Sequence, residues 1–301
     1  MTKLSRLAGL TAALVLVSTA VQAATPIKVK DTPAYEWGSA AGGGWLAWSQ
    51  GPHRRGDHDL YVKRAGHPTD VVELGAFQEV GNIETGGSHD NILVYAFEPA
   101  TGDTDIRFYD LDTGSVSAPP AGVNGPKDDD YPSISGNFLL FGRGPVSGFF
   151  SKKVLIYDFT TTNIQTIVSA PSGSTVTPDS IRGDFLTYDV CPSTGRCNVF
   201  RKQISTGAKI KMPNPRRATY WSSVLEDGTV YYVQGSPTSC GVNTRIMRRA
   251  PGGAVTRLFQ FPNGIEIGDL DAVETLSGPV VYFTRINCLK DNTAGIWKIK
   301  G

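Results

Sequence analysis

The most concentrated charge in the sequence is the run Asp128-Asp129-Asp130. Further carboxylates, a pair of guanidinium groups and several aromatic rings lie beside turn-rich segments elsewhere in the chain. Such a mixture suits a polar ligand, a sugar or a loop of a partner protein, and carboxylate oxygens are also ligands for calcium or magnesium. The candidate ligand-binding residues are Glu36, Trp37, Asp128, Asp129, Asp130, Arg216, Arg217, Tyr220, Trp221, Glu266, Asp269 and Asp271.

The sequence contains no familiar catalytic motif. A G-x-S-x-G nucleophile turn, an H-E-x-x-H zinc motif, a phosphate-binding loop and a dinucleotide fingerprint are all missing from it. Its four histidines, His53, His58, His67 and His89, are scattered, and we interpret them as surface residues. These observations weigh against an enzyme without excluding one.

The first 23 residues have the pattern of a secretory signal peptide. Lys3 and Arg6 precede a short apolar stretch, and Val21-Gln22-Ala23 offers small residues for cleavage. We therefore expect a mature chain of residues 24–301 that is secreted or stays in the periplasm or cell envelope, without membrane insertion. Removing two cations leaves 27 Lys and Arg against 28 Asp and Glu, so no basic excess indicates nucleic acid.

The elements that must position the candidate residues follow from a repeat. Four-residue apolar runs come directly after turn residues at Trp45–Trp48, Ile92–Tyr95, Phe138–Phe141, Phe185–Tyr188, Val230–Val233 and Val280–Phe283. Their second positions lie 47, 46, 47, 45 and 50 residues apart. A period in the forties with strand signals throughout is typical of the blades of a β-propeller. We assign the aromatic residues of these runs to packing between blades.

Each repeat contains further strands. Third strands are predicted at 60–62, 106–109, 154–157, 199–200, 246–247 and 296–297, and outer strands at 71–74, 165–168, 209–211 and 255–259. The sixth repeat ends after its third strand, whereas residues 26–30 form a strand without a repeat of its own. The prediction is an all-β, six-bladed propeller of four-stranded antiparallel blades, in which the N-terminal strand closes the last blade. The predicted blades span about 35–75, 78–118, 128–170, 175–212, 219–260 and 265–301.

Fragments of these repeats resemble a known family. Asp129-x-x-Pro132-Ser133-Ile134-Ser135-Gly136, followed by an apolar strand, is similar to the repeat of TolB-like propellers. Ser223 with Glu226-Asp227-Gly228 looks similar in the fifth repeat, and Phe108 to Gly114 in the second. The resemblance extends over residues 24–301 as degenerate repeats, and TolB's N-terminal domain has no counterpart. It implies the propeller fold and, more weakly, a binding platform.

The four cysteines test this architecture. An even number in an exported chain indicates two disulfides, for which three pairings exist. Cys191 and Cys197 flank one loop of blade four, whereas Cys240 and Cys288 lie in equivalent loops of neighbouring blades. The propeller therefore favours the pairs 191–197 and 240–288.

In a propeller, the connections between blades and the loops between second and third strands surround one mouth of the central channel. The candidate residues above fall in these segments, so we expect a polar mouth that binds a protein or a glycan. The alternative for the residues is that they are solvated loop positions. The alternative for the protein is a lyase or hydrolase acting on a carbohydrate or lactone, with a metal at the mouth. We expect a monomer without a cofactor, calcium or magnesium being the alternative.

Overall fold

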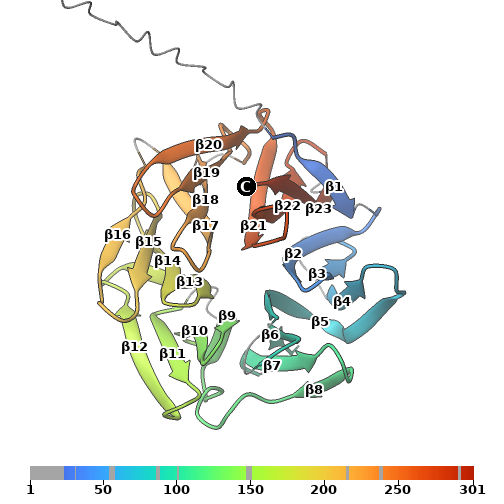
Figure 1. Cartoon of the computed structure of the whole chain (residues 1–301), viewed down its shortest axis with the longest axis vertical. Coiled ribbons are helices and arrows are strands. Elements are labelled where there is room, and N and C mark those ends of the chain that lie inside the picture. The colour runs from blue at the N-terminus through green and yellow to red at the C-terminus, as the bar shows by residue number, and fades with distance from the viewer. Residues whose placement is uncertain are drawn as a thin grey trace, which may run out of the picture.

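In the computed structural model, the chain forms a six-bladed β-propeller around a central channel (Figure 1). The structure describes residues 24–30, 32–53, 58–85, 89–99, 102–146, 151–214, 217–236, 240–290 and 293–301, with the backbone alone for 74–78. The expected signal peptide, residues 1–23, lies outside this range. Within it, no helix is long and apolar enough to cross a membrane.

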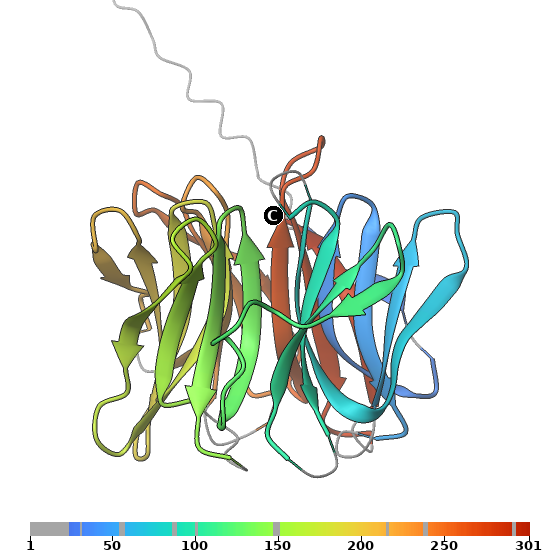
Figure 2. The ribbon, with the colours of Figure 1, turned by 90° about the horizontal axis from the view of Figure 1, so that it is seen from below.

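The inner strand of each blade lines the channel, and the strands run along its axis (Figure 2). The inner strands are β2 (Tyr35–Gly42), β5 (Thr69–Glu84), β9 (Asp128–Ser135), β13 (Ser174–Arg182), β17 (Ala218–Val224) and β21 (Ile265–Val273). The second strands are β3 (Trp45–Gly51), β6 (Ile92–Glu98), β10 (Phe138–Gly144), β14 (Phe185–Pro192), β18 (Val230–Gly235) and β22 (Val280–Asn287). All six predicted apolar runs are therefore second strands.

The third strands also lie where they were predicted. They are β4 (His58–Arg64), β7 (Asp105–Asp110), β11 (Lys153–Asp158), β15 (Asn198–Gln203), β19 (Arg245–Arg249) and β23 (Thr293–Lys300). The outer strands are β8 (Ser115–Ser117), β12 (Asn163–Ser169), β16 (Lys209–Lys211), β20 (Val255–Gln260) and β1 (Ile27–Lys30). In blade one the outer position belongs to the first half of β5, which continues without a break into the inner strand of blade two. Blades one and two thus form one seven-stranded sheet.

The N-terminal strand closes the ring as predicted. β1 pairs antiparallel with β23, with Ile27 opposite Lys298 and Lys28 opposite Trp297. Blade six is consequently built from both ends of the described chain. This pairing covers the edge of β23, which would otherwise expose unpaired backbone groups.

Apolar side chains fill the space between blades. The aromatic residues at the last position of the apolar runs are almost fully buried, namely Trp48, Tyr95, Phe141, Tyr188 and Phe283. One core cluster joins Leu140 and Val154 of blade three to Val176 and Ile181 of blade four, and the other clusters also join neighbouring blades. The assignment of these residues to packing is confirmed.

A belt of polar contacts joins the inner strands of successive blades. Ile181 N donates to Ser133 Oγ at 3.1 Å, and Ala272 N donates to Ser223 Oγ at 3.0 Å. The equivalent acceptor is Asn82 between blades two and three, and Asp271 between blades six and one. The serines of the TolB-like motif therefore serve the assembly of the ring, because they satisfy backbone N–H groups that face the neighbouring blade.

Both predicted disulfides are present. Cys191–Cys197 closes the loop between β14 and β15, and Cys240–Cys288 joins loops of blades five and six with Cα atoms 6.0 Å apart. No free cysteine remains. The second bridge clamps two neighbouring blades at the end of the channel where the inner strands begin.

Candidate functional site

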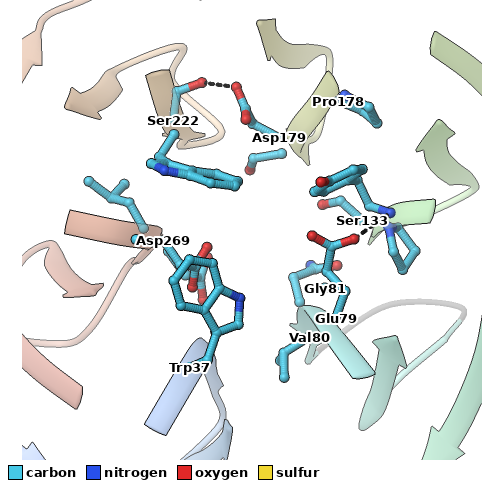
Figure 3. A pocket seen from close by; sticks show the side chains of 18 residues that line it. Trp37, Glu79, Val80, Gly81, Ser133, Pro178, Asp179, Ser222 and Asp269 are labelled. Carbon is cyan, nitrogen blue, oxygen red and sulfur yellow. Dashed lines mark hydrogen bonds between the residues drawn. The ribbon is translucent and has the colours of Figure 1, made fainter. Parts of the chain in front are cut away.

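A cavity of about 40 Å³ lies inside the channel and is lined by residues from all six inner strands (Figure 3). A volume of this size holds only a few water molecules. Each inner strand carries a β-bulge beside the cavity, for example at Gly38, Asp179 and Gly268. Because a bulge turns side chains away from the regular alternation of a strand, these six irregularities determine which groups face the channel.

Aromatic rings and carboxyl groups alternate around the cavity. Blades one, three and five contribute Trp37, Tyr131 and Trp221, while blades two, four and six contribute Glu79, Asp179 and Asp269. Figure 3 shows Trp37 on one side of the opening and the carboxylate of Glu79 directed into it from the other. The result is a ring of three π faces and three acids with approximate threefold symmetry.

The backbone is unusual at two of the rings. Tyr131 has φ of 50° and Trp221 has φ of 46°, values in the left-handed region that non-glycine residues rarely occupy. Blade one places Gly38 in the same conformation, with φ of 56°. A strained conformation held at two large aromatic residues beside a cavity is the kind of outlier that marks a functional site.

Asp179 and Asp189 form a buried carboxyl pair beside the cavity. Asp179 Oδ2 accepts a hydrogen bond from Ser222 Oγ at 2.5 Å, and Asp189 Oδ2 accepts one from Trp221 N at 3.3 Å. The remaining oxygens, both Oδ1, are buried without a donor among the described residues. Burial raises the pKa of Asp179 to about 7, and burial with the charge of Asp179 raises the pKa of Asp189 well above its usual value. The two carboxyls therefore share a proton near neutral pH.

The other acids of the ring are perturbed in the same direction. Burial raises the pKa of Asp269 to about 7, against the opposing effect of a hydrogen bond from Ser39 N at 2.7 Å. Burial and the charge of Asp130 raise the pKa of Glu79 well above its usual range, although Glu79 accepts a hydrogen bond from Tyr131 N. Acids that repel one another in a low-dielectric channel cannot all be ionised, so a cation placed between them would be strongly stabilised.

An arginine, Arg182, lies beside Asp271 at the end of the cavity away from the mouth. Arg182, at the end of β13, lies 3.5 Å from a carboxylate oxygen of Glu84 and 3.9 Å from one of Asp271. Its guanidinium also donates to the carbonyl of Ile134 at 3.3 Å. One side chain thus links blades two, three and six to blade four, and it gives the channel a cationic floor.

Four of the predicted ligand-binding residues line the cavity. Trp37 and Trp221 meet edge to face with ring centroids 6.3 Å apart, and Asp269 and Asp271 face the channel from blade six. The fold therefore brings residues of blades one, five and six together at the cavity.

The structure places Asp128, Asp129 and Asp130 differently from the connection that the sequence suggested. All three belong to inner strand β9 and are buried. Asp128 accepts a hydrogen bond from Thr104 N, Asp129 forms a 2.6 Å ion pair with Arg143, and Asp130 accepts a hydrogen bond from Ser151 Oγ. They bind groups of blades two and three and do not line the cavity.

The remaining predicted residues lie around the mouth without lining the cavity. Glu36 is buried and accepts a hydrogen bond from Thr32 N, and Arg217 donates to the carbonyl of Asn243. Tyr220 is half-buried in the core cluster of blades five and six, and Glu266 lies beside the Cys240–Cys288 bridge. Arg216 lies outside the described residues.

Sequence reasoning missed Glu79, Tyr131 and Asp179. Tyr131, Gly38 and Pro178 each lie seven residues before the start of their second strands, so an alignment of the repeats on those strands would have placed Tyr131 and Asp179 close to the position of Trp37. Glu79 had no such signal, because the long β5 and the longer turn after it shift the register of blade two.

The interpretation of all histidines as surface residues is wrong for His58. Its side chain is buried, and Nε2 pairs with the carbonyl of His53 at 2.8 Å. His89 is half-buried against Phe159, with ring centroids 4.0 Å apart, and burial lowers its pKa. Neither histidine lies in the cavity, so the channel chemistry is carried by carboxyls and aromatic rings.

The described residues do not bring three metal-ligand atoms close together in the channel. Their one set of three ligand atoms within 4.8 Å of one another is Cys240, Glu266 and Cys288, and its two sulfurs form a disulfide. The ring carboxyls of Glu79, Asp179 and Asp269 are thus spread too widely to chelate one small ion directly.

The class defined by this fold is the six-bladed β-propeller with TolB-like repeats. A comparison with protein-family models finds no match, and a comparison with curated protein sequences finds none either. Solved structures do match. A putative TolB from Agrobacterium tumefaciens is similar with a TM-score of 0.57 and 12% identity, over 88% of this chain and 90% of that one.

Two further solved structures match this chain at low identity. TolB from Acinetobacter baumannii matches with a TM-score of 0.49 and 14% identity, over 89% of this chain. A prolyl endopeptidase matches with a TM-score of 0.51 and 10% identity, also over 89% of this chain. This chain spans 63% and 41% of their respective lengths. At these identities the similarity concerns the fold, which is that of TolB-like propellers.

The raised pKa values predict a pH-dependent stability. Asp179 titrates near pH 7 in the folded protein and near 4 when unfolded, so the folded state holds a proton that the unfolded state releases. Stability is then expected to fall as pH rises from about 4 to about 7. Asp179→Asn, whose amide can donate to Asp189, should raise the free energy of unfolding by about 1–2 kcal/mol at pH 8 and change it little at pH 5.

Urea unfolding at pH 5 and pH 8 measures this effect. The exposed Asp70→Asn serves as the matched control, since it makes the same change on the outer part of β5. Because burial lowers the pKa of His89, this residue makes stability rise with pH below about pH 6.5. It is a single group, whereas several buried acids make stability fall. If Asp179→Asn changed the free energy of unfolding by the same amount at pH 5 and pH 8, the two carboxyls would not share a proton.

Proposed function

We propose that the protein is an exported binding module that engages a partner protein through the mouth of its central channel. The observation that carries this proposal is the ring of three aromatic and three acidic side chains around a small cavity. Aromatic residues in a partly buried pocket are typical anchors for a partner's side chain. The strained Tyr131 and Trp221 support the same reading, because strain at such positions is retained where it serves binding.

A protein partner fits the cavity better than a glycan. Sugar rings bind by stacking on an exposed aromatic face, whereas Trp37 and Trp221 meet edge to face and narrow the opening. A cavity of about 40 Å³ admits the end of one side chain. The loops around the mouth could then contact the rest of the partner segment.

Export is supported by the two disulfides. Such bridges form and persist in oxidising compartments, that is, outside the cytosol. Together with the predicted signal peptide this favours a periplasmic or secreted protein. The monomeric state and the absence of membrane insertion stay predictions.

Site-specific photo-crosslinking in the organism's own exported fraction tests the proposal. A photoreactive residue at Asn243, an exposed position in the mouth loop of blade five, should capture a discrete partner. The same residue at Leu276, fully exposed in the turn after β21 on the opposite face, should not. Trp221→Ala should reduce capture at Asn243. Equal capture at both positions, or capture indifferent to Trp221→Ala, would contradict the proposal.

The second candidate, a lyase or hydrolase acting on a carbohydrate or lactone, is favoured by one observation. The Asp179–Asp189 pair offers a proton donor and acceptor near neutral pH beside a cavity. Assistance by calcium or magnesium stays a proposal, for which the spread of the ring carboxyls gives no support. Two experiments would test this candidate. The metal content of the purified protein and its melting temperature before and after chelation would be measured, and a panel of lactones and glycosides would be screened for turnover. Turnover that Asp179→Asn abolishes would place this candidate first.

A further inference from the structure

We propose that the channel receives a cationic head group, an ammonium or guanidinium, carried by a Lys or Arg side chain of the partner protein. The inference deepens the proposed function and rests on it. It follows from the kinds of side chain that surround the cavity, from their alternation and from the size of the space between them.

The lining of the cavity is acidic. The cavity is lined by Glu79, Asp179, Asp269 and Asp271, and no Lys, Arg or His is among its lining residues. The nearby Arg182 is engaged at the floor by Glu84 and Asp271. The three acids of the ring have no cationic partner among the described ion pairs, so the upper cavity has an uncompensated negative potential that favours a cation.

Aromatic rings lie beside these acids around the cavity. A cation within about 6 Å of a ring face is attracted by the negative face of the π system, and the attraction strengthens where water is excluded. Trp37, Tyr131 and Trp221 surround the cavity at alternate positions, so a group at its centre is adjacent to rings as well as carboxyls. An organic cation can use both, whereas a small, strongly hydrated metal ion uses oxygen ligands.

The Asp179–Asp189 pair depends on its shared proton. Asp189 is 95% buried, and neither its Oδ1 nor that of Asp179, which lines the cavity, accepts a hydrogen bond from any other described group. Buried carboxyl oxygens are normally paired with a donor. A cation entering beside Asp179 would supply the missing positive charge, and the proton now shared by the pair would leave.

The size of the cavity suits a small organic cation. A cavity of about 40 Å³ holds roughly three water molecules, which is close to the space of an ammonium or a planar guanidinium group. The carboxyl oxygens do not approach within 4.8 Å of one another in threes, a spacing that leaves a polyatomic cation between them. The apolar stem of a Lys or Arg side chain would lie beside Trp37 and Trp221, which are in edge-to-face contact with each other.

Proton release gives the proposal a measurable pH dependence. Asp179 faces three titratable groups, namely Asp189 from β14, Asp269 from β21 and the uncharged phenol of Tyr131 from β9. Asp269 in turn faces Asp271 of the same strand. Because a cation binds the ionised carboxyls, affinity should fall about tenfold per pH unit for each proton that must be released below pH 7.

Calorimetric titration of the purified full-length mature protein with n-butylammonium, methylguanidinium and neutral n-butanol tests the binding chemistry. The two cations should bind at pH 8 and n-butanol should not. Glu79→Gln should weaken cation binding at least tenfold, and Glu274→Gln, the same change at an exposed turn, should leave it unchanged. Asp269→Asn is the second variant if Glu79→Gln melts more than a few degrees lower. Cation affinity equal to that of n-butanol, or unaffected by Glu79→Gln and Asp269→Asn, would overturn the proposal.

The source of the cation is tested separately. The capped peptide Ac-Gly-Gly-Lys-Gly-Gly-NH2 should bind more tightly than n-butylammonium, and its norleucine counterpart should not bind. A free amine binding more tightly than the peptide would overturn the assignment to a protein side chain. Crosslinking at Asn243 that survives Glu79→Gln, with no cation binding, would defeat this inference and leave the proposed function standing. Cation binding without any crosslinked partner would instead defeat the proposed function.

Discussion

Replacing Arg182 by methionine is expected to lower the free energy of unfolding by about 3 kcal/mol at pH 8, because two carboxyls lose their shared cation. The Arg182 side chain is only 12% exposed, and it lies between Glu84 and Asp271 at the floor of the channel. Methionine keeps most of the volume and apolar contact, so the loss reports the charge. This single guanidinium connects blades two, three and six to blade four.

The effect should depend on pH. Burial already raises the pKa of Glu84, and it raises the pKa of Asp271 to about 6 against the lowering effect of Arg182. Without the arginine both pKa values rise further, so at pH 5 the folded variant keeps both carboxyls neutral. The destabilisation should therefore shrink to about 1 kcal/mol at pH 5 and grow as pH rises through the folded-state values.

Urea unfolding of Arg182→Met at pH 5 and pH 8 measures both quantities. Arg196→Met, at an exposed loop position, is the matched control and should change stability by less than about 0.5 kcal/mol. Adding Asp271→Asn to Arg182→Met should restore part of the loss at pH 8, since one uncompensated charge is removed. A loss that is the same at both pH values and is not relieved by Asp271→Asn would show that Arg182 acts by packing alone.

The sequence was sufficient for the fold because the decisive signals are local and repeated. Each second strand is marked by an apolar run directly after a turn, as at Phe138–Phe141. Six such runs at a nearly constant spacing predict a six-bladed propeller. The ring closure and the disulfide pairs then followed from topology, and the pairing of β1 with β23 confirms the first.

The site was only partly predictable because inner strands of a propeller are polar on the channel side. Asp128-Asp129-Asp130 looked like a solvated connection, yet burial with Arg143, Ser151 and Thr104 turns the run into part of a strand. The bulges are the second obstacle. An extra residue at Asp179 or Trp221 shifts the alternation of the strand, so the sequence does not indicate which side chain faces the channel.

Removing the Cys240–Cys288 bridge by replacing both cysteines with serine is expected to cost about 4 kcal/mol of unfolding free energy on the loop-entropy model. The bridge joins positions 48 residues apart in sequence, and cross-linking them restricts the unfolded chain over that whole span. The Cys191–Cys197 bridge closes a span of 6 residues, so its removal should cost only about 2 kcal/mol.

The comparison of the two double variants separates loop entropy from native contacts. Each variant is unfolded in urea, with the wild-type protein reduced and alkylated as a third sample. A chain of this size should melt about 2–4 °C lower per kcal/mol lost, so the 240/288 variant should melt roughly 8–16 °C lower. Because this bridge joins blade five, which supplies Trp221, to blade six, which supplies Asp269, its loss would also loosen the mouth. Equal losses of stability in the two double variants would contradict the loop-entropy model, because the two bridges close spans of 6 and 48 residues. The stabilising effect of the 240–288 bridge would then have to come from contacts in the folded protein, such as those around Glu266.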